Sequence, residues 1–146
     1  MASVVYNEFK RASASGEIDL KGGDDIRVRL VMSNTTCDTE NDAILFLANF
    51  TTIDVCDGAG YVDKALAGEA VATDDPNDRA EFDATDVTWA ALGVGTRTTV
   101  GVLIYKFVTA DADSVPIAFV EFAAAVTHDG TDFVIQWNAE GILQLA

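Results

Sequence analysis

Basic residues are scarce in this chain. Its 146 residues include 9 lysines and arginines against 24 aspartates and glutamates, which gives a net charge of −15. Binding to nucleic acid needs clustered Lys and Arg to neutralise phosphates, so we expect no nucleic-acid partner. Aspartate outnumbers glutamate by 17 to 7. Because aspartate is poor in helices and common in turns, this excess favours a fold of strands and turns.

Histidine and cysteine are also nearly missing. His128 is the single histidine, and Cys37 and Cys56 are the only cysteines. A structural zinc site needs four nitrogen or sulfur ligands, and three candidates spread along the chain do not supply them. Two free thiols are the default expectation for a protein assembled in a cytosol, although the two cysteines could still meet across adjacent loops. The sequence therefore predicts no metal site and no cofactor.

Long apolar runs are lacking as well. A membrane span needs roughly 18 to 20 apolar residues, and the longest candidate, Ile117 to Val126, is interrupted by Glu121. The first residues do not combine a charged region with an apolar stretch, so no signal peptide is predicted. We expect a protein that folds in the cytoplasm and has no membrane partner.

Motifs of catalysis are absent from the sequence. It contains no G-x-S-x-G nucleophile elbow, and His128 precedes Asp129-Gly130, a tight-turn dipeptide, so it is interpreted as a turn residue. The acids of the segment Asp74 to Asp78 could ligate Ca²⁺ or act as a general acid and base, but a solvated turn explains them more simply. We predict a protein that is not an enzyme, with no catalytic residue.

Alternating apolar and polar residues dominate the rest of the chain. Residues 26 to 30 (IRVRL) show the period of two of a half-buried strand, and Thr98 to Val108 is apolar on both faces, as a central strand would be. Such segments, separated by frequent turns, predict an all-β fold: an antiparallel β-sandwich of the jelly-roll or immunoglobulin-like kind. Ser3 to Ser13 has the apolar spacing of a short amphipathic helix. Residues 1–15 are therefore expected to form an N-terminal arm or short helix, and residues 16–146 a single β-sandwich domain.

Several blocks resemble a family of small virion structural proteins of tailed bacteriophages. They include YNEFK near the N-terminus, GEIDL, DDIRVRLV, VLIYK and PIAFVEF. The most specific blocks are DPNDRAEFDATDVTW at Asp75 to Trp89 and WNAEGIL at Trp137 to Leu143. The resemblance covers nearly the whole chain except Ser33 to Gly60.

The resemblance implies a capsid decoration, or cement, protein that sits on the outer surface of the icosahedral head and stabilises the junctions between capsomers. The implied partners are the major capsid protein and further copies of the chain, in a trimer that would match a three-fold position. The implied location is the capsid surface of a virion assembled in the host cytoplasm. A neck or tail-associated virion protein, or a sandwich that binds a small molecule or glycan, are the alternatives.

The N-terminal segment is the expected contact surface for a partner. Interfaces need an apolar anchor with a polar rim. The candidate partner-binding residues are Val4, Tyr6, Phe9, Lys10 and Arg11, and the Ser33 to Gly60 segment is a further candidate. The alternative for Tyr6 and Phe9 is that they cap the open end of their own sandwich.

Overall fold

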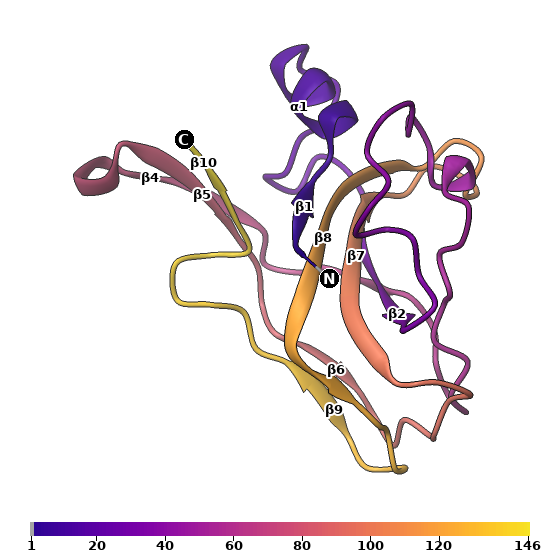
Figure 1. Ribbon diagram of the computed structural model, residues 1–146. Coiled ribbons are helices and arrows are strands. Elements are labelled where there is room, and N and C mark those ends of the chain that lie inside the picture. The colour runs from indigo at the N-terminus through magenta and orange to yellow at the C-terminus, as the bar shows by residue number, and fades with distance from the viewer. Residues whose placement is uncertain (1) are drawn as a thin grey trace.

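Five antiparallel strands form the main sheet, in the order β1-β8-β7-β2-β3 (Figure 1). The computed structural model describes residues 2–146. The strands span Val4–Val5 (β1), Val115–Val126 (β8), Thr99–Lys106 (β7), Ile26–Met32 (β2) and Lys64–Ala65 (β3). β7 lies in the middle of this sheet, as its apolar character on both faces predicts, and residues 101–105 are all buried.

Two smaller sheets form the second layer. One has the order β10-β5-β4 and contains Ala70–Asp74 (β4), Arg79–Asp83 (β5) and Leu143–Leu145 (β10), with the 3₁₀ turn Asp75–Asn77 between β4 and β5. The other pairs Val87–Trp89 (β6) with Phe133–Ile135 (β9). The prediction of an all-β sandwich with one short N-terminal helix is confirmed, since 35% of the residues lie in strands and 10% are helical.

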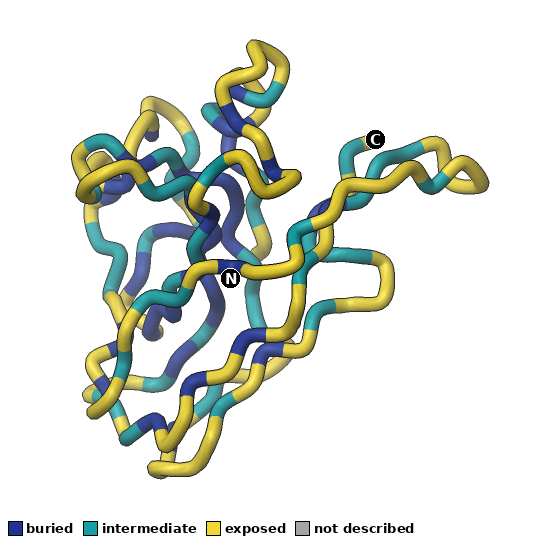
Figure 2. Tube along the Cα trace, turned by 180° about the vertical axis from the view of Figure 1, so that it is seen from behind, coloured by how far each residue is buried: buried dark blue, intermediate teal, exposed yellow. Residues whose placement is uncertain are grey.

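The sheet of β4, β5 and β10 projects away from the body of the molecule, and we call it the wing (Figure 1). Its strands are mostly exposed or half-buried, whereas the buried chain is concentrated in the main sheet (Figure 2). All residues of β4 except Asp74 are exposed. Phe82 of β5 is fully buried, and it fixes the wing to the body.

The core has two parts, which lie on opposite faces of the main sheet because neighbouring strand residues point to opposite sides. The larger part joins the main sheet to the wing and to the β6–β9 pair, and includes Val28, Leu30, Val102, Ile104, Ala118, Phe82, Trp89 and Leu143. The smaller part includes Val31, Leu103, Tyr105 and Phe119, and is covered by Tyr6, Cys37, Ile44, Leu47 and Phe50.

The segment from Ser33 to Gly60 therefore covers one face of the main sheet. Ile44, Leu47 and Phe50 are buried against that face. Leu47 begins the 3₁₀ turn Leu47–Asn49 (η1), which Phe50 follows directly. This long connection, which has few regular elements, covers one face of the main sheet, whereas the two smaller sheets cover the other face. Most of its large apolar side chains are used inside the protein, although Leu45 and Phe46 stay 51% and 38% exposed.

The N-terminal helix is shorter than predicted. Val4 and Val5 form β1 and pair with Phe119 and Ala118 of β8, and only then does the helix α1 span Asn7–Ala14. Two β-branched residues in succession favour a strand over a helix, which explains why the helix does not begin at Ser3. β1 and α1 are thus built into the sandwich rather than standing apart as an arm.

Gly101 of β7 is packed closely by a ring of the neighbouring strand. An added Cβ atom at this position would lie 2.6 Å from two ring atoms of Phe119 and 2.6 Å from the carbonyl oxygen of Val120. Stacking an aromatic ring over a strand glycine compensates for the missing side chain. The two strands shift register beside this glycine.

Candidate interaction site

The predicted aromatic anchors of the N-terminal segment are buried inside the chain itself. Tyr6 and Phe9 have 0% exposed surface, the Tyr6 hydroxyl donates to the Cys37 carbonyl at 2.7 Å, and its ring meets that of Phe50 edge-on at 5.3 Å. Burial holds the pKa of Tyr6 far above its usual range. Of the two interpretations, the one in which Tyr6 and Phe9 pack on their own domain is the one observed, so these two residues are not surface anchors.

The remaining residues of that predicted set are at the surface. Val4 is half-buried against the smaller core, and Lys10 and Arg11 are exposed on α1. Arg11 forms ion pairs with Glu8 and Glu17, both at 2.6 Å. Its charge is therefore largely balanced by acids of the same chain rather than presented to an acidic partner.

A half-buried polar cluster links β2 and β7 to the segments that precede β3 and follow β7. The Asp63 carboxylate accepts from the hydroxyls of Tyr61 at 2.7 Å and Tyr105 at 2.6 Å and from Arg29 Nε at 2.8 Å. The two other Arg29 nitrogens donate to Asp111, each at 3.0 Å. Burial raises the pKa of both tyrosines. These donors and acceptors satisfy one another's hydrogen bonds, so the cluster links segments that are distant in the sequence.

The acidic turn of the wing is gathered around one arginine. Arg79 contacts Asp74 at 2.9 Å, Glu81 at 2.8 Å and Glu140 at 2.9 Å. Asp78 ends the 3₁₀ turn in the left-handed conformation, with φ of 51°. Within residues 2–146 no group of three or more acids, histidines or cysteines is placed to hold a metal ion.

His128 and the two cysteines lie inside the protein. His128 is 6% exposed, its Nε2 lies 2.9 Å from the Thr99 hydroxyl, and burial lowers its pKa. Cys37 and Cys56 are buried free thiols that belong to different parts of the core. Burial raises the pKa of Cys37 to about 11, so its thiol is protonated and unreactive at neutral pH.

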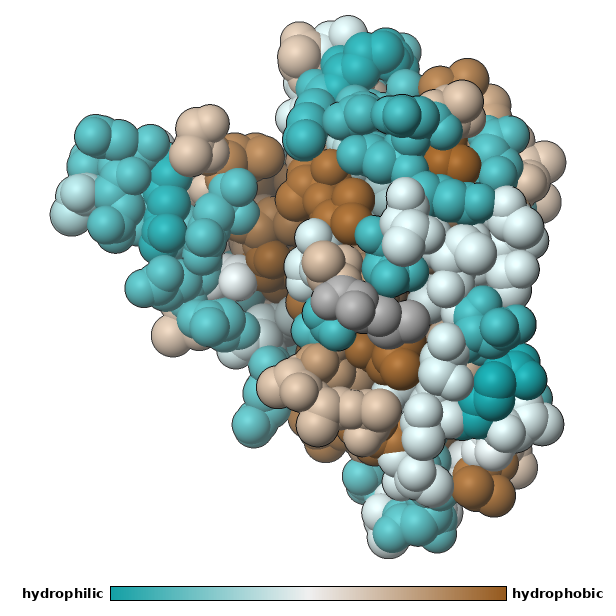
Figure 3. Space-filling view, in the orientation of Figure 1, coloured by the Kyte–Doolittle hydropathy of each residue, from teal (hydrophilic) through white to brown (hydrophobic). Residues whose placement is uncertain are grey.

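A trough runs along β8 where the wing meets the body. Its first part has a volume of about 360 Å³ and is lined by Ser3, Val4, Val5, Ala118, Phe119, Val120, Asn138, Gly141, Ile142, Leu143 and Gln144. A second part of about 450 Å³ continues along β8 to Ala123, with residues 135–138 as its other wall. Apolar residues gather in the recess beside the wing (Figure 3).

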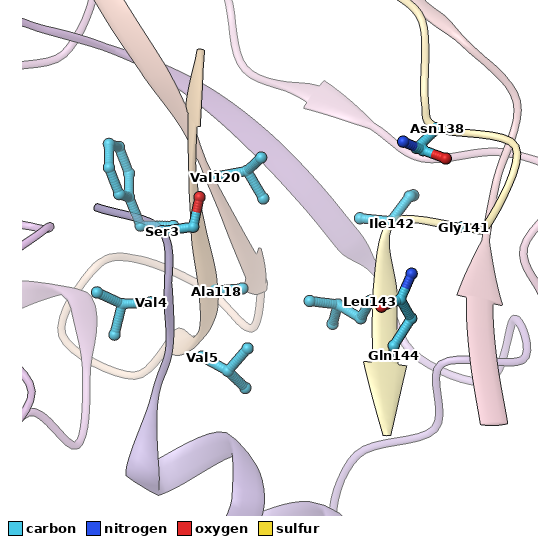
Figure 4. A pocket seen from close by; sticks show the side chains of 11 residues that line it. Ser3, Val4, Val5, Ala118, Val120, Asn138, Gly141, Ile142, Leu143 and Gln144 are labelled. Carbon is cyan, nitrogen blue, oxygen red and sulfur yellow. The ribbon is translucent and has the colours of Figure 1, made fainter. Parts of the chain in front are cut away.

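The two walls of the trough come from opposite ends of the chain. Val5 of β1 and Leu143 of β10 point toward one another across the first part, whereas Val4 points away from it (Figure 4). Ala118 and Val120 of β8 lie on the same face as Val5, because Val5 pairs with Ala118. A face of the main sheet and an edge of the wing therefore meet here without filling the space between them.

The described lining of the first part contains no charged side chain, although 33 residues of the chain (24 acidic and 9 basic) are charged. The second part adds a single one, Glu121. Removing a concave, largely apolar surface of this kind from water lowers the free energy. Sequence inspection identified Val4 in this region but missed Val5, Ala118, Val120 and Leu143, because only the folded chain brings them together.

No family model matches the sequence, and no curated protein and no solved structure matches it either. Among residues 2–146 there is no helix with the length and apolar content that crossing a membrane requires.

Proposed function

We propose that this chain is a virion structural protein that binds the outer surface of an icosahedral phage head as a decoration protein. In this role it binds the major capsid protein, as a trimer at three-fold positions. Many equivalent copies each add interface area at a junction between subunits, and they stabilise the shell because they bind only its assembled form.

The observation that carries the proposal is that the two blocks with the most specific resemblance form one structural unit. The block from Asp75 to Trp89 contains β5 and β6, and the block from Trp137 to Leu143 lies against it. Ile142 N–H donates to the Phe82 carbonyl at 2.7 Å, and Trp137 donates from its backbone to Asp86 and from its ring to Thr85, each at 3.1 Å. Residues 51 to 60 positions apart in the sequence thus combine into a single surface element at the root of the wing.

The shape of the molecule agrees with a binding role. The wing projects from the body, and the trough at its root has Glu121 as the single charged residue of its described lining. It offers apolar surface in a protein whose exterior is otherwise strongly acidic. Protein interfaces use an apolar centre of this kind inside a polar rim.

The test uses the expanded, empty head of the phage whose genome encodes the chain. Purified protein is mixed with heads that lack it, the heads are sedimented, and bound copies are counted by quantitative mass spectrometry. We expect on the order of hundreds of copies per head, as the repeated positions of an icosahedral shell require, and a higher temperature of head disruption. Absence of binding would refute the proposal.

The same measurement separates the neck or tail alternative. A protein at a unique vertex is present in roughly a dozen copies or fewer, because the symmetry there is that of a single ring. Such a count in complete virions, with no binding to empty heads, would place the protein at the neck or tail instead.

A further inference from the structure

We propose that the trough is a docking site for an extended, uncharged segment of a partner polypeptide, which adds as a strand to the free edge of β1 and places alternate side chains between β1 and β10. The inference rests on the proposed function, since the capsid protein is then the partner that supplies the segment.

The free edge of β1 follows from its pairing with β8. Tyr6 N–H donates to the Ile117 carbonyl at 3.0 Å, and Val4 and Val5 lie opposite Phe119 and Ala118. Hydrogen-bonded and non-bonded pairs alternate in an antiparallel ladder. Val4 therefore bonds to β8, and the N–H and carbonyl groups of Val5 point away from it.

An outward-facing strand edge is a ready template for another strand. β1 is the last described strand on its side of the main sheet. A segment paired with it would add a sixth strand, and every second side chain of that segment would enter the space next to Leu143. Backbone groups fix its direction, and the apolar trough selects its side chains.

The length of the trough suits an extended segment. Its lining follows β8 from Ala118 to Ala123, which are six residues and span roughly 20 Å at the rise of a strand. Small residues widen the floor at Ala118 and Gly141, so medium-sized apolar side chains of the partner have room there.

The chemistry of the lining selects the occupant. A charged segment would lose its hydration in the trough without gaining an ion pair there. The lining has no basic residue that would attract an acidic segment. The fitting occupant is a neutral, apolar stretch from a different polypeptide.

Two substitutions test the site by different routes. Val5→Pro removes the outward N–H and replaces the isopropyl group by an apolar ring of similar size, and proline is tolerated on an edge strand where the N–H faces away from the ladder. Gln144→Lys places a charge at an exposed position of the trough. Thr73→Lys is the matched control, because Thr73 is exposed on β4, at the opposite edge of the same small sheet.

Each variant is first checked for folding by circular dichroism and for its mass by light scattering, and is then titrated against empty heads. We expect Val5→Pro and Gln144→Lys each to bind about tenfold more weakly or worse, and Thr73→Lys to bind as the parent does. In hydrogen exchange, the Val5 amide of the parent protein should become at least about tenfold more protected on the heads.

The outcomes separate the two proposals. If the parent binds heads and both trough variants bind equally well, the docking site is wrong while the decoration role stands. If the parent does not bind heads, the decoration role and the docking site fall together. If light scattering shows an oligomer of the free protein that Val5→Pro dissociates, the occupant is a second copy, and the inference of a different partner is overturned.

Discussion

Replacing Gly101 by alanine should destabilise the protein more than a single methyl group suggests. The new Cβ would lie 2.6 Å from the Phe119 ring and 2.6 Å from the Val120 carbonyl oxygen, and neither can retreat easily because Phe119 is fully buried and Val120 is held in the β7–β8 ladder. Overpacking of this kind costs about 1–3 kcal/mol, and alanine regains about 0.5–1 kcal/mol of backbone entropy. We expect a net loss of about 1 kcal/mol.

Urea denaturation and thermal melting measure this loss. For a chain of this size the melting temperature should fall by about 3 °C. The double variant Gly101→Ala/Phe119→Leu removes the ring from the contact but leaves the Val120 carbonyl in place, so the alanine should cost about half as much in that background. Strictly additive effects in the double-mutant cycle, or an unchanged stability of the single variant, would refute the steric reasoning.

Two further predictions concern polar groups of the interior. Arg29→Lys should lower the free energy of unfolding by about 1–3 kcal/mol, because an ammonium group does not reproduce the planar contacts to Asp63 and Asp111; an unchanged urea midpoint would show that the polar cluster does not tie these segments together. Burial lowers the pKa of His128 in the folded protein, so the unfolded chain binds its proton first as the pH falls. Stability should therefore decrease as the pH drops below about 6.5, and His128→Asn should lack this component when both proteins are melted at a series of pH values.

Sequence periodicity predicted the fold best where the apolar pattern is unbroken. Thr98 to Val108 is apolar on both faces, and only a strand flanked by neighbours on both sides and covered on both faces buries such a segment. The alternation from Ile26 to Leu30 similarly fixes which residues of β2 face the larger core. Local pattern and tertiary burial agree in these strands, so one predicts the other.

The predictions were weaker where long-range packing decides the structure. Val5, Ala118 and Leu143 line the trough together only because both ends of the chain return to β8. No local sequence pattern predicts that these residues come together. Tyr6 resembles a surface aromatic in the sequence because it lies near a terminus, yet its hydroxyl finds the Cys37 carbonyl 31 residues away. The segment from Ser33 to Gly60 lacks periodicity because its apolar residues cover a sheet from irregular backbone.

The placement of the two cysteines on opposite faces of the main sheet makes each thiol a reporter of a different layer. Both cysteines belong to the Ser33 to Gly60 segment, but Cys37 is buried in the smaller part of the core and Cys56 in the larger part. A thiol reagent modifies a buried cysteine only when the layer above it opens, so the labelling rate measures the free energy of that opening. Comparing the two rates distinguishes opening of the smaller part of the core from opening of the larger part, without any engineered probe. Each part of the core thus contains a native thiol whose labelling rate reports its local unfolding.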